Sequence, residues 1–204
     1  MSQQQSDLVL GVVLAGGQSR RMGGPDKALL QLGGRSLLAN ALDRLAPQVD
    51  VLAVSASRAY QDADARSVPV IPDSMAGYEG PLVGLASTMQ WAVDDPRDFA
   101  WLACIAVDTP LFPEDFVSTL QESADAHARA MVATSAGRKH PTCGLFHVRL
   151  LPGLQQFLQA GHRKMGQWLD EVDAVSVPFD DRPGDPFANI NTPEDLAALE
   201  SKLP

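Results

Sequence analysis

Short segments that are almost entirely apolar alternate along the chain with longer segments in which apolar residues recur at helical spacing. Continuous apolar runs of this length are typical of strands buried on both faces of a parallel sheet. The predicted strands span residues 8–14, 49–54, 68–71, 100–107, 130–134, 142–148 and 172–179. Because residues 136–139 turn the chain before the sixth of these strands, we expect that strand to be antiparallel to its neighbour.

Helix signals lie between these strands. Ser36 can cap a helix whose apolar stripe continues to Leu45. Pro81 suits the first turn of a helix that continues to Val93. Thr192 is the expected N-cap of the last helix, with Pro193 in its first turn. The remaining predicted helices lie at 60–66, from 113–115 onward, at 151–161 and at 163–171.

Strands that alternate with helices predict an α/β fold with a mainly parallel sheet. In such sheets ligands bind beyond the carboxyl ends of the strands. A glycine-rich loop follows the first predicted strand, and Ser55, Asp73 and Asp108 follow or end the next three. We therefore expect a functional site where these four strand ends meet.

The loop after the first strand combines glycines with cations. Gly16 and Gly17 open it, and Arg20, Arg21 and Lys27 add three positive charges. Glycine-rich turns expose successive N–H groups that bind anions, so a polyphosphate is the expected ligand. The spacing matches neither common phosphate-binding motif. The alternative interpretation is a simple turn between a strand and a helix.

Carboxylate and carboxamide side chains at the same edge suggest further chemistry. Asp108 is well placed to hold Mg²⁺ together with substrate phosphates, or it caps the turn before Pro110. Asp73 could accept a hydrogen bond from a base or a sugar, or it could simply cap Ser74. Asn189 and Asn191 could ligate a metal or a phosphate, or support the last helix. These groups suit phosphoryl-type transfer by positioning and charge neutralisation.

Composition narrows the possible partners. The 204 residues carry a net charge of −9, which argues against nucleic acid or an anionic membrane as a general partner. No apolar run approaches the ~20 residues that span a bilayer, and we expect a flexible tail at 1–7 and a single domain at 8–204. With two cysteines, Cys104 and Cys143, a disulfide framework is excluded and a reduced cytoplasm is expected. His140, predicted in a loop, could contact a ligand or serve the structure.

Six motifs together span nearly the whole chain. They are LAGG at 14–17, RMGGPDK at 21–27, GPLVGL at 80–85, DTP at 108–110, HPT at 140–142 and NINTPEDL at 189–196. In sequence and in order, the set resembles the molybdenum cofactor guanylyltransferase (MobA) family. LAGG followed by RMG and a lysine is shared by many sugar-nucleotide and cofactor nucleotidyltransferases, whereas the full set is much more specific.

The resemblance implies a Rossmann-like nucleotidyltransferase fold with helices on both faces of the sheet. It also implies an Mg²⁺-dependent reaction in which GTP and Mo-molybdopterin give molybdopterin guanine dinucleotide and pyrophosphate. A terminal phosphate oxygen of molybdopterin would attack the α-phosphorus of GTP in line. Molybdoenzyme maturation proteins are the further partners that the resemblance implies.

The resemblance also assigns residues to this reaction. Nucleotide contacts are implied for Leu14, Ala15, Gly16, Gly17, Lys27, Ser55, Asp73 and Asp108. Arg21 and Lys27 would neutralise the triphosphate, and Asp108 would bind Mg²⁺. Molybdopterin contacts are implied for Gly80, Asn189 and Asn191.

Two features bear on the choice of nucleotide. The family commonly has asparagine where this chain has Ser55, so the base or ribose contact at that position is lost or passes through water. The related cytidylyltransferase has LAAG and DQP where this chain has LAGG and DTP, and Gly16 leaves room for a purine edge. Guanine is therefore favoured over cytosine. The alternatives are cytidylyl or sugar-phosphate transfer, and a non-catalytic nucleotide-binding adaptor for molybdoenzyme maturation.

Overall fold

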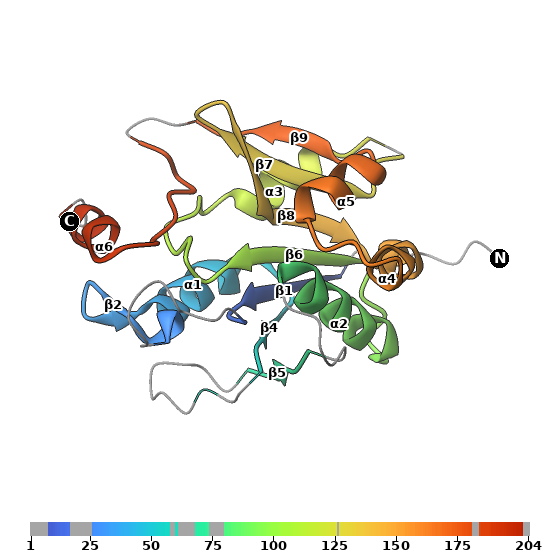
Figure 1. Ribbon diagram of the computed structural model, residues 1–204, viewed down its shortest axis with the longest axis horizontal. Helices are drawn as coiled ribbons and strands as arrows, with labels where there is room; N and C mark the ends of the chain where they lie inside the picture. Colours follow the sequence, from blue (N-terminus) through green and yellow to red (C-terminus); the bar gives the residue numbers. More distant parts are fainter. Residues whose placement is uncertain are drawn as a thin grey trace.

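A seven-stranded sheet lies at the centre of the computed structural model, which describes residues 8–16, 26–57, 60, 68–73, 80–125, 127–180 and 184–201. The strands are β1 (Val9–Leu14), β4 (Val51–Ser55), β5 (Val70–Ile71), β6 (Trp101–Ala106), β7 (Ala130–Ser135), β8 (Arg138–His147) and β9 (Val175–Pro178). Their order across the sheet is β5-β4-β1-β6-β8-β7-β9 (Figure 1). β8 is antiparallel to both of its neighbours, β6 and β7, whereas the other adjacent strands are parallel. The predicted α/β fold with a mainly parallel sheet is confirmed.

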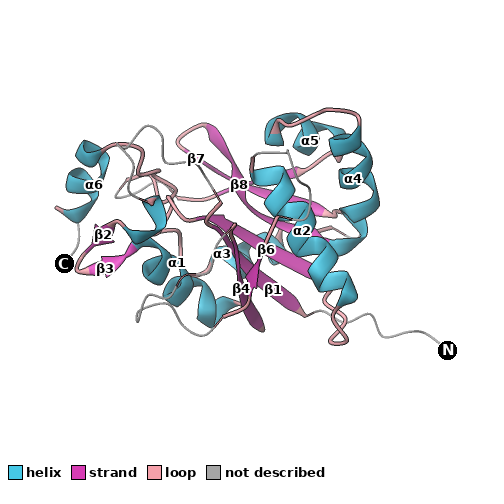
Figure 2. Cartoon of the chain, turned by 60° about the horizontal axis from the view of Figure 1, so that its bottom comes forward, coloured by secondary structure: helices cyan, strands magenta, loops and turns pink. Residues whose placement is uncertain are grey.

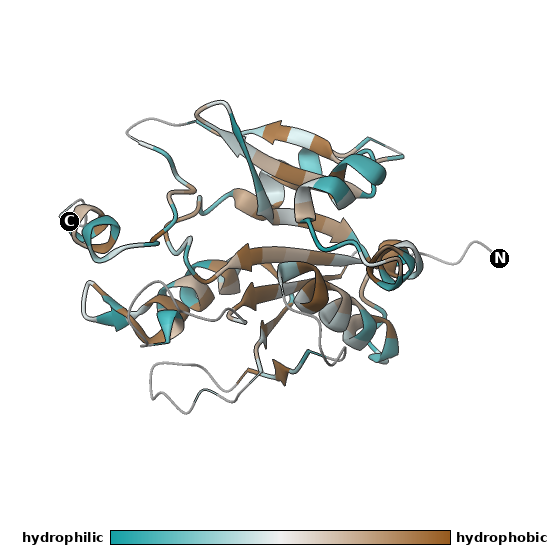
Figure 3. Cartoon of the chain, viewed as in Figure 1, coloured by the Kyte–Doolittle hydropathy of each residue, from teal (hydrophilic) through white to brown (hydrophobic). Residues whose placement is uncertain are grey.

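The first strand is buried on both faces, as its apolar sequence predicts. Val9 and Val13 face one hydrophobic core, while Leu10 and Val12 face the other, because successive side chains of a strand point to opposite faces. Figure 3 shows apolar residues along β1 and β6 and more polar residues on the surrounding helices. The middle of the sheet therefore separates two cores.

Helices cover both faces of the sheet (Figure 2). Two of them, α1 (Leu37–Leu45) and α3 (Phe116–Glu122), bury residues in one core. Three others, α2 (Pro81–Asp94), α4 (Leu151–Gln159) and α5 (Met165–Glu171), bury residues in the other core. The remaining helices are α6 (Pro193–Glu200) and the 3-10 turns η2 (Lys27–Leu29), η3 (Ala46–Gln48) and η4 (Val148–Leu150). Within the described ranges, no helix is both long and apolar enough to cross a membrane.

Three predicted helix starts are confirmed, whereas α3 and α5 begin at Phe116 and Met165, a few residues after their predicted starts at 113 and 163. The Ser36 hydroxyl accepts a hydrogen bond from the Ala39 amide, in the first turn of α1, at 3.1 Å. Pro81 is the first residue of α2. Thr192 and Asp195 form a capping box at the start of α6. Of the helix predicted at 60–66, the structure describes Tyr60 alone.

One hairpin is missing from the sequence prediction. β2 (Gln31–Leu32) and β3 (Arg35–Ser36) pair antiparallel as a separate two-stranded sheet. Each strand has two residues, too few for an alternating pattern to show. The turn itself is typical, because Gly33 and Gly34 both have positive φ, at 61° and 76°.

A second difference concerns the start of β8, which lies at Arg138 and not at residue 142. Ala136 and Gly137 alone make the preceding turn, with φ of 49° and 72°. A two-residue turn of this kind matches the twist of the strands that it joins. His140 therefore lies in a strand, and its prediction as a loop residue is wrong.

Gly144 lies in β8 at a position that has no room for a side chain. A Cβ atom there would lie 2.5 Å from the main-chain oxygen of Met131 and 2.8 Å from Phe146 Cζ. We expect Gly144→Ala to lower the free energy of unfolding by about 1–3 kcal/mol, the usual cost of overpacking. The measurement is urea denaturation. Gly153→Ala in α4 is the matched control. It should not destabilise the protein, because nothing lies within 4 Å of a Cβ atom built there and alanine favours helix. Equal stability of the two variants would contradict this account.

Candidate active site

Four parallel strands end level with one another. Leu14 at the end of β1 is in register with Ser55 of β4 and with Ala106 of β6, and Ser55 is in register with Ile71 of β5. The ladder continues one residue further, because the Ala15 amide donates to the Ser55 oxygen at 2.9 Å. The convergence of strand ends expected from the sequence is therefore present.

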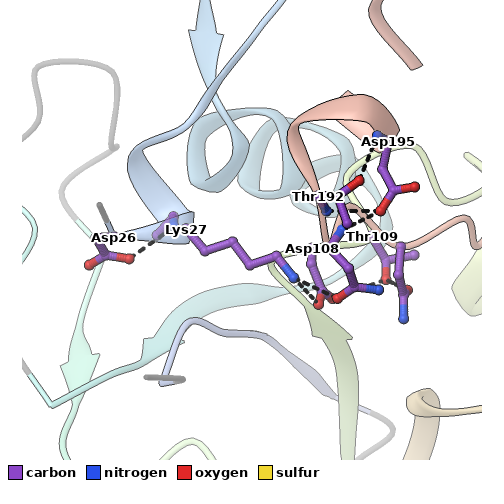
Figure 4. Close-up of polar contacts among 9 residues, drawn as sticks. Asp26, Lys27, Asp108, Thr109, Thr192 and Asp195 are labelled. Atoms are coloured by element: carbon purple, nitrogen blue, oxygen red, sulfur yellow. Dashed lines mark hydrogen bonds and ion pairs between the residues drawn. The ribbon is translucent and has the colours of Figure 1, made fainter. Parts of the chain in front are cut away.

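An ion pair lies at this edge (Figure 4). The Lys27 Nζ atom is 2.8 Å from Asp108 Oδ2 and 3.0 Å from Asn191 Oδ1. The side chains of Lys27 and Asp108 are 18% and 22% exposed, so solvent screens the pair only in part. Three distant segments of the chain thus bring a cation, a carboxylate and a carboxamide together.

The segment 185–191, here called the 185–191 loop, docks on the turn that carries Asp108. The Ile190 amide donates to the main-chain oxygen of Asp108 at 2.9 Å. The Thr109 hydroxyl donates to Asn189 Oδ1 at 2.8 Å. Ile190 is buried in the core that α1 and α3 share, so the backbone between the two asparagines is anchored. Asn189 therefore contacts the Asp108 turn directly, while Asn191 contacts Lys27, the partner of Asp108.

The start of α6 holds Asn191 in place. Asp195 Oδ2 accepts hydrogen bonds from the Asn191 and Thr192 amides, each at 2.9 Å. These two amides lower the pKa of the Asp195 carboxyl. The capping box at the start of α6 thus also orients a candidate site residue.

Two residues that the sequence analysis did not single out lie next to Lys27. Asp26 caps η2, since its Oδ1 accepts a hydrogen bond from the Ala28 amide at 2.9 Å. The Tyr60 hydroxyl donates to Asp26 Oδ2 at 3.1 Å and lies 3.4 Å from the Ala15 oxygen. Asp26 could have been found from its position before the lysine in the RMGGPDK motif, whereas nothing in the sequence pairs it with Tyr60.

Asp73 and Gly16 face each other across the edge of the sheet. A Cβ atom on Gly16 would lie 3.9 Å from Asp73 Oδ2 and 3.9 Å from the Ser55 oxygen. Burial raises the pKa of the Asp73 carboxyl. The glycine thus leaves open the space between its own backbone, Asp73 and the end of β4.

The hydroxyl of Ser55 is turned away from this space. Ser55 is buried, and its Oγ would lie 2.5 Å from a Cβ atom built on Gly84 of α2. Its main-chain oxygen is the part that borders Gly16. Gly80 is the N-cap residue of the same helix, with φ of 124°. The predicted contacts of Ser55 and Gly80 with substrates stay predictions, as do those of Leu14 and Ala15.

Gly17 and Arg21, which were predicted to bind the nucleotide, lie outside the described residues, as do Arg20, Gly23 and Gly24. Among the residues that are described, no group of three or more His, Cys, Asp or Glu side chains could hold a metal by itself. Asp108 and the two asparagine oxygens are nevertheless hard oxygen donors. Mg²⁺ is usually bound by one or two carboxylates together with substrate phosphates, and this donor set fits that mode.

Comparisons with known proteins agree on one family. Residues 11–175 match the model of the MobA-like NTP transferase domain. A molybdenum cofactor guanylyltransferase of Rhodopseudomonas palustris (strain BisB5) is 41% identical over 191 residues, which cover 93% of this chain and 91% of that protein. The protein of the same name from Mesorhizobium japonicum is 40% identical over 199 residues and 93% of each chain.

Solved structures show the same fold. The molybdopterin-guanine dinucleotide biosynthesis protein A of Archaeoglobus fulgidus superposes with a TM-score of 0.75 at 23% identity, over 94% of this chain and 97% of that one. A protein of Mycobacterium tuberculosis, Rv0371c, superposes with a TM-score of 0.69 at 23% identity, over 97% and 99% of the two chains. The Rossmann-like nucleotidyltransferase fold that the motifs implied is confirmed.

Proposed function

Because the chain belongs to the MobA-like NTP transferase family, we propose that it transfers GMP from GTP to Mo-molybdopterin, forming molybdopterin guanine dinucleotide and pyrophosphate. The observation that carries this proposal is the 41% identity, over 93% of the chain, to a protein named molybdenum cofactor guanylyltransferase. A nucleotidyltransferase needs fixed charges around a triphosphate. In this proposal, Lys27 at the carboxyl edge would supply a cation, and its partner Asp108 would supply a carboxylate for a metal ion.

Asp108 is the residue proposed to hold Mg²⁺, together with the phosphates of GTP. The ion would neutralise charge on the α-phosphate and on the pyrophosphate that leaves. The ammonium of Lys27 would bind the triphosphate, with Arg21 as a second cation. The backbone of residues 14–17 and the Asp73 carboxylate would position the nucleotide. The lack of a side chain at Gly16, which lies next to Asp73 and the end of β4, would leave room for a purine edge.

The acceptor is proposed to lie on the side of the 185–191 loop. Asn189 and Asn191 are held by Thr109 and Lys27 in the structure, and their amide groups are candidates for the molybdopterin phosphate. Gly80 would border the same substrate at the start of α2. We also infer that the protein acts in the cytoplasm, since Cys104 and Cys143 are both free, buried thiols. The family resemblance makes molybdoenzyme maturation proteins the proposed recipients of its product.

Nucleotide selectivity gives the first test. Thermal unfolding is measured with GTP, CTP, ATP or UTP, each with Mg²⁺. GTP at about 100 times its dissociation constant should add roughly 2.7 kcal/mol to the free energy of unfolding, and the other nucleotides should add less. A larger shift with CTP would instead indicate cytidylyl transfer.

Turnover then separates an enzyme from a binding protein. Pyrophosphate release is measured with GTP, Mg²⁺ and Mo-molybdopterin, and compared with the same mixture without the acceptor. Release that depends on the acceptor is expected. Tight GTP binding without release of pyrophosphate would indicate an adaptor without catalytic activity.

A further inference from the structure

A second polar cluster lies at the same edge of the sheet as Asp108. β7 runs parallel to β6, because β8 is antiparallel to both, so Ser135 at the end of β7 lies at the edge where Asp108 follows β6. Asp185 reaches Ser135 from the segment between β9 and α6. Its Oδ1 accepts hydrogen bonds from the Ser135 hydroxyl at 2.6 Å and from the Phe187 amide at 2.9 Å.

His140 completes the buried part of the cluster, with Nε2 at 2.7 Å from Ser135 Oγ. A serine hydroxyl has one hydrogen, which Ser135 donates to Asp185, so His140 must donate from Nε2. Burial lowers the pKa of His140, and this effect outweighs the nearby charge of Asp185, which raises it. Burial opposes the charge of Asp185, but the hydrogen bonds from Ser135 and Phe187 outweigh it and lower the pKa of that carboxyl.

Asp185 and His140 hold the same residue, Phe187. The carboxylate accepts a hydrogen bond from the Phe187 amide, and the imidazole stacks on its ring with the centroids 4.9 Å apart. The ring also packs edge-on against Phe116 and Phe179, with centroids 5.9 and 5.1 Å apart. The start of the 185–191 loop is thereby fixed to the hairpin of β7 and β8.

We propose that Asp185 is a positioning residue for guanylyl transfer. It would hold the 185–191 loop so that Asn189 meets Thr109 and Asn191 meets Lys27, which are its contacts at the candidate active site. Phe187 precedes these asparagines by two and four residues, so a change in its position moves both. The inference rests on the proposed function, because it assigns Asp185 a part in that reaction.

The buried partners of Asp185, and not its exposed partner, are expected to hold the 185–191 loop. Ser135 and His140 are 4% and 9% exposed. Arg138, which donates to Asp185 Oδ2 at 2.8 Å, has a side chain that is 70% exposed. Exposed ion pairs contribute little to stability, because water screens them. Arg138→Met is therefore a matched control that removes a partner of Asp185 and leaves the buried hydrogen bonds intact.

The rate test uses Asp185→Ala in the full chain. Loss of the carboxylate should lower kcat for pyrophosphate release from GTP and Mo-molybdopterin by about 10–100-fold, since a misplacement of about 1 Å has effects of this size. The KM for GTP should change little, because Asp185 acts through the loop. Asp185→Asn keeps an oxygen that can accept the same two hydrogen bonds, so it should restore part of kcat. Arg138→Met should keep the wild-type rate.

Deuterium uptake gives a second measurement that needs no turnover. Residues 185–191 should take up deuterium faster in Asp185→Ala and at the wild-type rate in Arg138→Met. If Asp185→Ala does not fold, Ser135→Ala removes a single donor and should change kcat and uptake in the same direction. A wild-type kcat in a folded variant that lacks the carboxylate, or unchanged uptake, would overturn the proposal. If the wild type releases no pyrophosphate, the proposed function fails, and the uptake still shows whether Asp185 holds the loop.

Discussion

Asp108→Asn is expected to lower guanylyl transfer by at least about 100-fold while the protein stays folded. Loss of an outer residue that merely orients a metal ligand costs about 10–100-fold, so loss of the charge that holds the metal should cost more. Asparagine keeps the size of the side chain. The main-chain oxygen of residue 108 can still accept the Ile190 amide, which anchors the 185–191 loop. The measurement is the initial rate of pyrophosphate release at saturating GTP and Mg²⁺, beside the thermal midpoint.

Asp43→Asn is the matched control for this charge change. Asp43 lies on α1, where it pairs with the half-exposed Arg35 at 2.7 Å. Its loss should leave the rate unchanged, because exposed pairs of this kind contribute little. A wild-type rate for Asp108→Asn would remove Asp108 from the metal site. A rate that falls only as much as the folded fraction falls would give Asp108 a structural role alone.

The location of the candidate site at the carboxyl edge of the sheet could be predicted, because each strand end is recognisable from a short stretch of sequence. Each of β1, β4 and β6 is an apolar run that ends at a polar residue or a glycine, and parallel strands bring such ends to one edge. Asp108 directly follows one of these runs. The position of a residue just after a buried strand is thus readable without knowledge of its neighbours.

The contacts between distant segments could not be predicted in the same way. Lys27 and Asn191 are 164 residues apart, and no periodicity in the sequence encodes their contact. Likewise, the apolar sequences of β7 and β8 do not reveal the strand order, in which β8 lies between β6 and β7. Asp185 is the clearest case, because it lies in no periodic segment and acquires its partners, Ser135 and His140, only through that strand order.

The direction of a side chain at a strand end is also difficult to predict from the sequence. Ser55 was placed at the site because it ends an apolar run, and the family resemblance assigned it to the nucleotide. Its hydroxyl nevertheless faces Gly84 in the interior. Successive residues of a strand point to opposite faces, so a shift of one residue decides between site and core. The missing side chain of Gly84 is what allows α2 to approach Ser55, and this depends on the packing of two elements at once.

Lys27→Met is expected to have opposite effects on two ligands. The ammonium of Lys27 lies 2.8 Å from Asp108, so it competes with a divalent cation for the same carboxylate. Its removal should weaken GTP binding by about tenfold or more, because a charge-assisted contact with phosphate is lost. The same change should strengthen Mn²⁺ binding to the nucleotide-free protein, since Asp108 is released from its partner. Methionine keeps most of the apolar stem of lysine, so packing should be preserved.

Titration of GTP by calorimetry and of Mn²⁺ by electron paramagnetic resonance measures the two affinities separately. Lys139→Met is the matched control, since Lys139 contacts Asp170 at 3.5 Å on the surface and both side chains are exposed; neither affinity should change. Unchanged GTP affinity in Lys27→Met would remove Lys27 from the phosphate site. Unchanged or weaker Mn²⁺ binding would mean that Asp108 does not exchange Lys27 for a metal ion. Tighter Mn²⁺ binding together with weaker GTP binding in Lys27→Met would support an exchange of partners. In that exchange, Lys27 leaves the Asp108 carboxylate and binds the phosphates when nucleotide and metal bind together, because a single ammonium cannot neutralise both groups at once.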